Sequence, residues 1–129
     1  MQRFILLLLL AAVCGCSDRV RVTGRVTFSD GSPLTVGEVR FVNDKMVFSG
    51  TLKQDGSYEL GSGGSANGIV LGKYNVSIEY AGVPGETKPG QMYPEQIPLV
   101  AAKYADYATS GISCEVKGSM TFNITVEKP

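Results

Sequence analysis

Apolar and polar side chains alternate along most of the chain beyond residue 19, a pattern typical of β-strands that bury one face. In the first such stretch the apolar face is formed by Val20, Val22, Val26 and Phe28, and the polar face by Arg21, Thr23, Arg25 and Thr27. Gly24 falls on the apolar face. Because glycine brings no side chain to a strand, we expect a bulge or a close approach of another backbone there.

The same alternation predicts six further strands. Their apolar residues are Val39 and Phe41; Met46, Phe48 and Leu52; Tyr58 and Leu60; Tyr74, Val76, Ile78 and Tyr80; Ile112, Cys114 and Val116; and Phe122, Ile124 and Val126. Turns are predicted at Asp30–Pro33 and at Asp55-Gly56, where positive φ angles would form a tight hairpin. These features predict an all-β fold, a single antiparallel two-sheet β-sandwich of about seven strands.

Two segments lack this alternation. Gly61–Gly68 is rich in glycine and serine and predicts an exposed loop. The segment 81–110 contains four prolines, and unstructured segments of this length are uncommon in compact domains unless they are functional or partly disordered. A short helical turn is expected around Leu99–Tyr104.

The N-terminal residues form a different pattern. Arg3 supplies a positive charge, and residues 4–13 carry no polar side chain. A short positive start followed by roughly 7–15 apolar residues is typical of a secretory signal peptide. The apolar run is about half of the roughly 20 residues that a membrane-spanning helix needs. We therefore expect residues 1–15 to be a signal peptide.

The end of this run, Val13-Cys14-Gly15-Cys16, resembles the lipobox of bacterial lipoproteins. The resemblance implies cleavage between Gly15 and Cys16, and a thioether-linked diacylglycerol and an amide-linked acyl chain such as palmitate on Cys16. Several acyl chains anchor a protein firmly, at about 0.8 kcal/mol per buried CH₂. Ser17 follows the cysteine, which by analogy with enterobacterial sorting favours the outer membrane or cell surface over the inner membrane. The alternative is an ordinary signal peptide with incidental cysteines.

Charge and cysteine content narrow the classes of partner. The 12 basic and 12 acidic residues of the whole chain balance, and loss of Arg3 leaves one more acid than base. Binding to nucleic acid needs a basic face, so it is not expected. The mature length fits one domain, with residues 16–19 as lipidated N-terminus and linker and residues 20–129 as the sandwich. Once Cys16 is acylated, Cys114 has no partner for an internal disulfide.

Several short motifs resemble carboxypeptidase regulatory-like domains, which are transthyretin-like (prealbumin-like) sandwiches. They are Val22-Thr23-Gly24-Arg25-Val26, Asp30-Gly31-Ser32-Pro33-Leu34, Gly37-Glu38-Val39-Arg40-Phe41, Asp55-Gly56-Ser57-Tyr58 and Gly72–Ile78. Ala102-Lys103-Tyr104, Thr109-Ser110-Gly111 and Glu115-Val116 are similar to the small planctomycete-type lipoproteins of that family. The resemblance covers about residues 20–126 and implies a fold and an export route. It implies no catalytic residues, since such domains are accessory modules.

Few residues suggest catalysis or metal binding. The absence of histidine removes the usual general base and the commonest metal ligand. Cys114 alternates with polar neighbours on the face of Ile112 and Val116, so we expect a buried structural thiol rather than a nucleophile. Asp44, Asp55 and Glu59 are too scattered for a calcium loop. We expect no cofactor, no metal site and no enzymatic activity.

The tyrosines in or beside the long segment, Tyr80, Tyr93, Tyr104 and Tyr107, are the candidate binding surface, because loop tyrosines offer rigid amphipathic contact area. The alternative is that they cover the open end of the sandwich. The leading hypothesis is a lipid-anchored, non-enzymatic envelope module that contacts a protein, peptide or glycan. The competing hypotheses are a purely structural envelope-coat lipoprotein and a hydrolase that uses a pair of carboxylates.

Overall fold

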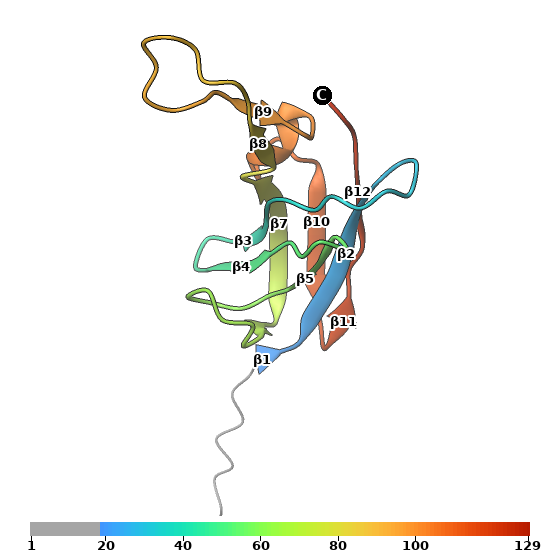
Figure 1. Cartoon of the computed structure of the whole chain (residues 1–129). Coiled ribbons are helices and arrows are strands. Elements are labelled where there is room, and N and C mark those ends of the chain that lie inside the picture. Colours follow the sequence, from blue (N-terminus) through green and yellow to red (C-terminus); the bar gives the residue numbers. More distant parts are fainter. Residues whose placement is uncertain (1–18) are drawn as a thin grey trace, which may run out of the picture.

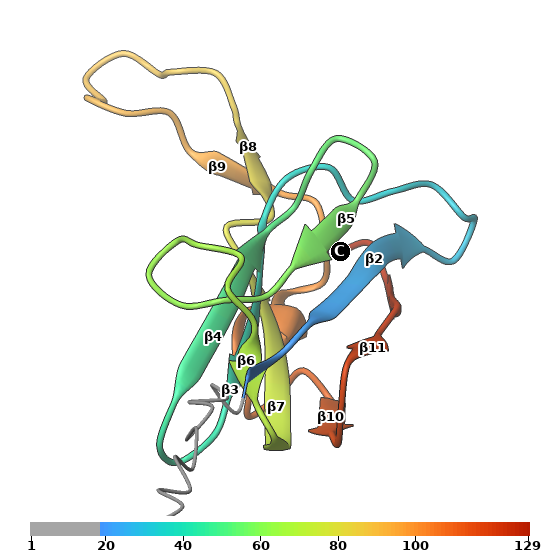
Figure 2. The same cartoon turned by 90° about the horizontal axis from the view of Figure 1, so that it is seen from below.

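The computed structural model describes residues 19–129, whose two four-stranded β-sheets pack against each other (Figures 1 and 2). One sheet has the order β10-β7-β3-β4, formed by β10 (Ile112–Val116), β7 (Gly72–Glu79), β3 (Glu38–Val42) and β4 (Val47–Thr51). In the other, β2 (Val22–Phe28) has β5 (Ser57–Glu59) on one side and β11 (Met120–Thr121) and β12 (Ile124–Val126) on the other. The predicted all-β sandwich is therefore confirmed.

The core lies where the inward faces of the two sheets meet. The alternating residues Val22 and Val26 from one sheet and Val39, Phe41 and Val76 from the other are fully buried. Each such side chain contributes about 1.5–3 kcal/mol through removal of its apolar surface from water. The burial follows the alternation read from the sequence, so the faces that these strands turn to the core were predicted correctly.

The direction of the final strands differs from the prediction. β11 and β12 both run parallel to β2, with Met120 opposite Val22 and Ile124 opposite Val26. The strand expected from Phe122 to Val126 is thus shortened to β12, the two-residue strand β11 forms the other part of this sheet edge, and the sandwich is not antiparallel throughout. Between the two parts, the Asn123 Oδ1 atom accepts a hydrogen bond from the Arg25 backbone N–H at 3.1 Å, which replaces a backbone partner.

Gly24 lies at this interruption, as the close approach expected from the sequence requires. A Cβ atom at Gly24 would overlap the backbone carbonyl of Phe122, and it would lie 2.7 Å from the hydroxyl of Tyr58. That hydroxyl donates a hydrogen bond to the Phe122 carbonyl. Glycine at this position therefore lets β2, β5 and the β11–β12 segment come together.

The Asp55-Gly56 turn forms the predicted hairpin, in which the Lys53 N–H donates to the Ser57 carbonyl at 2.9 Å. The Gly56 N–H donates to the Lys53 carbonyl at 2.9 Å, and within the turn only Gly56 has a positive φ angle, 80°. The arrangement is a β-turn with glycine at its fourth position. β5 then pairs with β2 of the other sheet, while Gly61 beyond it forms an antiparallel bridge with Ser49 of β4, so this hairpin joins the two sheets.

Two residues at strand ends depart from the predicted alternation. Met46 lies in the β3–β4 turn and is 40% exposed, with its N–H bonded to Asn43 Oδ1. Tyr80 follows β7 with a φ angle of 56°, which turns its side chain out of the core and leaves it 72% exposed. The exposure of both side chains is determined by tertiary structure, which the periodic pattern of the sequence does not show.

The long segment has more structure than expected. β8 (Gly82–Pro84) pairs with β9 (Gln96–Pro98) to form a hairpin, here called the arm, which projects from the sandwich in Figures 1 and 2. The predicted helical turn is the 3₁₀-helix η1 (Ala102–Ala105). At the other end of the sandwich, β1 (Arg19–Val20) pairs with β6 (Ile69–Val70) below the exposed 61–68 loop.

Candidate functional site

An apolar hollow lies where β7, the arm and η1 meet. It has a volume of about 460 Å³ and is lined by Ile78, Tyr80, Ala81, Gly82, Gln96, Pro98, Val100, Ala101, Ala102 and Ala105. This volume lies within the roughly 300–1,000 Å³ range of small-ligand sites. Most of the lining side chains are aliphatic and small, so the hollow has smooth apolar walls.

The backbone at the end of β7 creates one wall of the hollow. Tyr80 adopts the left-handed conformation that non-glycine residues rarely take, and the Gly82 N–H donates to its carbonyl at 3.0 Å. The chain therefore turns sharply from β7 into β8. Backbone strain of this kind is concentrated at binding and catalytic sites, where the surrounding structure maintains it.

The opposite wall is η1, which is held in place by its buried face. Tyr104 is 5% exposed, and its hydroxyl accepts a hydrogen bond from the Glu127 N–H at 3.2 Å. The Ala101 N–H donates to the Glu127 carbonyl at 2.9 Å, and the Ser110 hydroxyl donates to the Val76 carbonyl. These contacts fix η1 so that the small side chains of Ala102 and Ala105 face outward.

Tyr80 is positioned by a charged cluster on the outer face of the β3–β7 pair. The Arg40 guanidinium lies 5.6 Å from the centroid of the Tyr80 ring, within the range of a cation–π contact. Arg40 Nε donates to Glu38 Oε1 at 3.2 Å and lies 2.6 Å from Glu79 Oε2. The Nε–H bond points to Glu38, so the buried Glu79 Oε2 atom is stabilised by charge and receives no hydrogen bond from the described residues.

The same cluster bears on the carboxylate-hydrolase hypothesis. Glu38 and Glu79 are directly paired across β3 and β7, and both contact Arg40. Burial lowers the pKa of Arg40, but the Glu79 and Glu38 carboxylates outweigh it and hold that pKa above its ordinary value. A permanently charged guanidinium thus lies between the two acids. Their arrangement is that of an ion-pair network.

Of the four tyrosines predicted as a binding surface, three are exposed and one is buried. Tyr80 lines the hollow, and Tyr107, 49% exposed, borders a neighbouring depression with Arg40 and Glu79. Tyr93 is 78% exposed on the arm. Tyr104 is the buried residue of η1, so its assignment to an exposed surface was wrong. The alanines, Pro98 and Val100 of the hollow were missed, because their types and spacing carry no distinctive pattern.

Cys114 has the environment predicted for it. Its side chain lies in the core cluster, the residue is 7% exposed, and Sγ lies 3.9 Å from the sulfur of Met120. Burial raises the pKa of the Cys114 thiol. A raised pKa reduces the thiolate fraction and with it the reactivity of the sulfur. Gly15 and Cys16, the predicted cleavage and lipidation site, lie outside the described residues.

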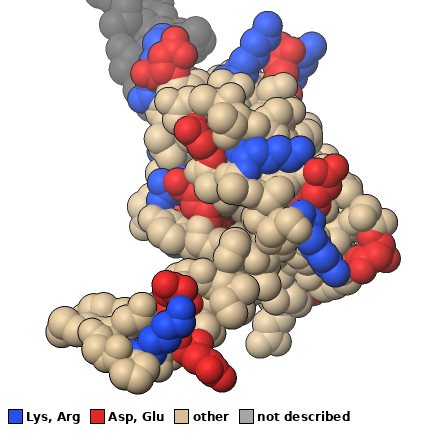
Figure 3. All heavy atoms as spheres, turned by 90° about the horizontal axis from the view of Figure 1, so that it is seen from above, with Lys and Arg blue, Asp and Glu red and all other residues tan. Residues whose placement is uncertain are grey.

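Residues 19–129 show neither a cluster of three potential metal ligands nor a helix long and apolar enough to cross a membrane. The charged side chains on the face seen from above are interspersed, with basic and acidic groups next to one another (Figure 3). The arm itself carries both signs, with Glu86, Lys88 and Glu95. None of the residues that line the hollow is charged.

Comparison of the sequence with protein-family models gives no match, and comparison with curated proteins gives none either. Among solved structures, the fold is similar to that of a DUF3823 family protein from Bacteroides ovatus. The two structures superpose with a TM-score of 0.50 and 18% sequence identity, over 85% of this chain and 45% of that one. The chain thus spans less than half of the protein it matches. At this identity the likeness supports a small β-rich domain and extends to the fold alone.

Proposed function

We propose that this protein is a lipid-anchored, non-enzymatic envelope module that binds a polypeptide partner through the apolar hollow between Tyr80 and η1. The observation that carries the proposal is the hollow itself, with small aliphatic walls and two lining side chains that can form hydrogen bonds, Tyr80 and Gln96. A glycan site needs several converging hydrogen-bonding groups, whereas an apolar side chain of a peptide or protein needs a shaped apolar surface. The lining therefore favours a polypeptide over a glycan.

Exposed groups around the hollow support the same proposal. Tyr80, Tyr93 and Ile97 are all at least half exposed and lie on or next to the arm. Aromatic residues at the centre of an interface commonly dominate its binding energy. Tyr80 is already held by its backbone conformation and by Arg40, so it would lose little side-chain entropy on binding.

The remaining parts of the proposal come from the sequence. The Val13–Cys16 lipobox supports export and acylation of Cys16, and Ser17 supports delivery to the outer membrane or cell surface. The motifs between Val22 and Ile78 resemble carboxypeptidase regulatory-like domains, whose transthyretin-like sandwich agrees in class with the observed fold. Membership of that family would make the chain an accessory module rather than an enzyme.

The experiment is a binding screen of the mature chain against an envelope extract, repeated with two alanine variants. Ala105→Glu places a carboxylate in the hollow, while Ala108→Glu adds the same charge at an exposed position outside the lining. A partner that uses the hollow binds the wild type and the Ala108→Glu variant and is lost from the Ala105→Glu variant. Equal binding by both variants, or reproducible absence of any partner, would overturn the proposal and favour a structural coat.

A further inference from the structure

The end of the sandwich opposite the arm, where β1 begins, carries a second surface. In Figure 1 this end, here called the β1 end, lies at the bottom, and the arm and the C-terminus lie at the top. Three loops meet there: the 43–46 turn between β3 and β4, the 71–73 segment at the start of β7, and the 117–119 turn between β10 and β11. The pairings of Val42 with Asn75, Val116 with Gly72 and Met120 with Val22 bring these loops together.

The chain enters the domain at a fixed point on the β1 end. The Arg19 guanidinium donates hydrogen bonds to Ser62 Oγ at 3.0 Å, to Asn67 Oδ1 at 3.1 Å and to the Gly68 carbonyl at 3.3 Å. It also lies 5.7 Å from the centroid of the Phe48 ring. These bonds tie β1 to the 61–68 loop, so the position of residue 19 on the sandwich is defined.

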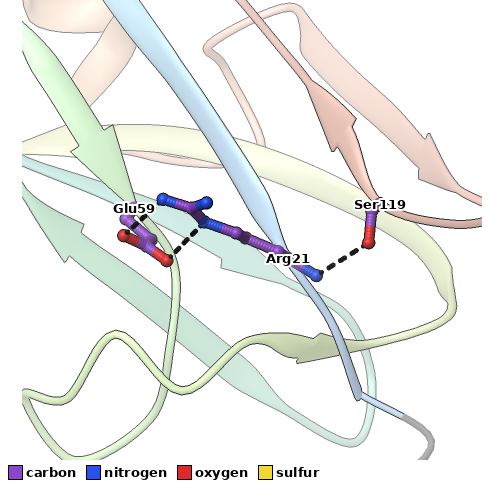
Figure 4. A network of polar contacts seen from close by, with 3 residues as sticks. All are labelled: Arg21, Glu59 and Ser119. Atoms are coloured by element: carbon purple, nitrogen blue, oxygen red, sulfur yellow. Dashed lines mark hydrogen bonds and ion pairs between the residues drawn. The ribbon is translucent and has the colours of Figure 1, made fainter.

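A second network fixes the neighbouring loops (Figure 4). Arg21 Nε donates to Glu59 Oε1 at 2.8 Å, and the Arg21 backbone N–H donates to Ser119 Oγ at 3.3 Å. One residue thus connects the start of β2 with β5 and with the 117–119 turn. Because Glu59 compensates the charge of Arg21, this ion pair shapes the surface without adding net charge to it.

The uncompensated charge at the β1 end is basic. Within residues 19–129, Lys45 and Lys73 have no carboxylate within 4.0 Å, and Arg19 is bonded to uncharged groups alone. Lys117 has a weak contact with Glu115 at 4.0 Å. Asp44 is the acid of this end that has no ion pair among the described residues. The balance therefore favours positive charge, although the 19–129 domain as a whole is neutral.

Apolar side chains accompany these basic groups. Met46 is 40% exposed and Leu71 is 49% exposed, next to Lys45 and close in sequence to Lys73. Asn43 Oδ1 accepts hydrogen bonds from the N–H groups of Lys45 and Met46, at 3.0 and 2.8 Å, and so holds the turn that presents both side chains. Basic groups beside exposed apolar groups match an anionic lipid surface, where charge meets the headgroups and apolar atoms enter the acyl boundary.

We propose that the β1 end is a docking surface for an anionic phospholipid bilayer, which holds the domain with the arm directed away from the membrane. The inference rests on the proposed acylation of Cys16, because three residues of extended chain reach only about 10 Å. Anchoring at Cys16 would keep the β1 end close to the headgroups. The hollow beside Tyr80 then faces the space beyond the membrane, where a partner has access to it.

The direct test places a fluorophore at one of two cysteines in a Cys114→Ala background of the mature lipidated protein. Leu71→Cys reports on the β1 end and Tyr93→Cys on the arm, both at exposed positions. The protein is reconstituted in vesicles of phosphatidylethanolamine, with or without phosphatidylglycerol, that carry brominated acyl chains as quenchers. We expect stronger quenching at position 71 than at position 93, in the vesicles with phosphatidylglycerol, and loss of the difference in high salt. Equal quenching at both positions, or no effect of the anionic lipid, would overturn the docking surface.

A set of Lys→Gln substitutions in a chain without the lipid tests the membrane affinity of this surface independently of the anchor. In the mature chain with Cys16→Ser, Lys45→Gln, Lys73→Gln and Lys117→Gln should each weaken partition onto the anionic vesicles about fivefold. The matched changes Lys88→Gln on the arm and Lys128→Gln near the C-terminus, both distant from the β1 end, should leave partition unchanged. Equal effects of the two sets would contradict the proposal. Mass spectrometry of the native N-terminus tests acylation separately. A missing lipid would refute the proposed anchor, and the lysine substitutions would still show whether the β1 end binds anionic lipid.

Discussion

The Tyr58 hydroxyl donates a hydrogen bond to the Phe122 carbonyl directly over Gly24, whose missing side chain makes room for the contact. The three residues belong to β5, to the segment between β11 and β12, and to β2. One glycine therefore permits three strands of a sheet to meet, and the stability of that sheet should depend on it.

Gly24→Ala should lower the free energy of unfolding by about 3 kcal/mol, because the new methyl group overlaps a backbone carbonyl that has nowhere to move. Urea denaturation followed by circular dichroism measures the change. Gly118→Ala is the control, since a Cβ there meets no atom within 4 Å, and it should stay within about 0.5 kcal/mol of the wild type. Equal stability of the two variants would contradict the close approach at Gly24.

Cys114 should resist alkylation in the folded protein and react quickly once denaturant is added. Burial protects the sulfur and also raises its pKa, which reduces the thiolate fraction at neutral pH. Cys114→Ala should cost roughly 1 kcal/mol, while Cys114→Asp should prevent stable folding because its charge has no partner. The pKa of Cys114 is higher in the folded than in the unfolded protein, so the protonated thiol stabilises the folded state at pH values below the unfolded pKa. This stabilisation is lost as pH rises through the folded-state pKa. Rapid labelling of the native protein would show that the strand register is wrong.

Ser57→Ala should raise the pKa of Asp55 toward its ordinary value of 3.8. In the native turn the Ser57 hydroxyl and N–H both donate to Asp55 Oδ1, at 2.6 and 3.0 Å, and they hold the pKa of that carboxyl low. A lowered folded-state pKa contributes stability above the unfolded pKa, and this stability is lost as pH falls through the folded value. Carboxyl ¹³C NMR titration measures the pKa.

Asp30 provides an internal reference for this titration. It occupies an equivalent Asp-Gly-Ser turn, in which Ser32 Oγ and N–H donate to Asp30 Oδ1, and its pKa is lowered in the same way. The Asp30 titration should not change in the Ser57→Ala variant. A shift of both carboxyls together would indicate a global change rather than loss of one hydrogen bond.

Tyr80→Gly should leave stability within about 1 kcal/mol of the wild type, because relief of the left-handed backbone offsets loss of the contact with Arg40. Tyr80→Val should be less stable than Tyr80→Gly by about 2 kcal/mol, since a β-branched residue is strained at a φ angle of 56°. Thermal and urea unfolding compare the two. If valine were tolerated as well as glycine, the backbone conformation at this position would not be as described.

Cys16→Ala should produce an unlipidated precursor that accumulates or is released, because lipid transfer needs that thiol. Cys14→Ala is the matched control, and it should still give a mature N-terminus at Cys16 with the lipid attached. Mass spectrometry of the N-terminus checks both, and an unmodified terminus that begins elsewhere would exclude the lipobox. Membrane fractionation that recovers the protein with the inner membrane alone would contradict the predicted sorting.

The sequence predicted the parts of the fold that local alternation determines. β2, β3, β7 and β10 bury the residues expected of them, and Gly24 marks a close approach because only glycine fits there. The parallel pairing of β12 with β2 was not predictable in this way, since the same alternation serves either direction. A single φ angle exposes Tyr80, which the alternation placed on the apolar face of a strand. A short 3₁₀-helix buries Tyr104, which was expected on an exposed surface. Both proposed surfaces combine loops distant in sequence, so neither has a local motif.

The pairing of β12 with β2 also has a consequence for the order in which the chain can fold. Arg25 and Asn123, which meet between these strands, are 98 residues apart in the sequence. One side of β2 has no partner until β11 and β12 have been synthesised, and contacts of such long range slow folding. The sheet built on β2 can therefore be completed only after residues 120–126 have been synthesised, so its last strands set the point at which the sandwich can close.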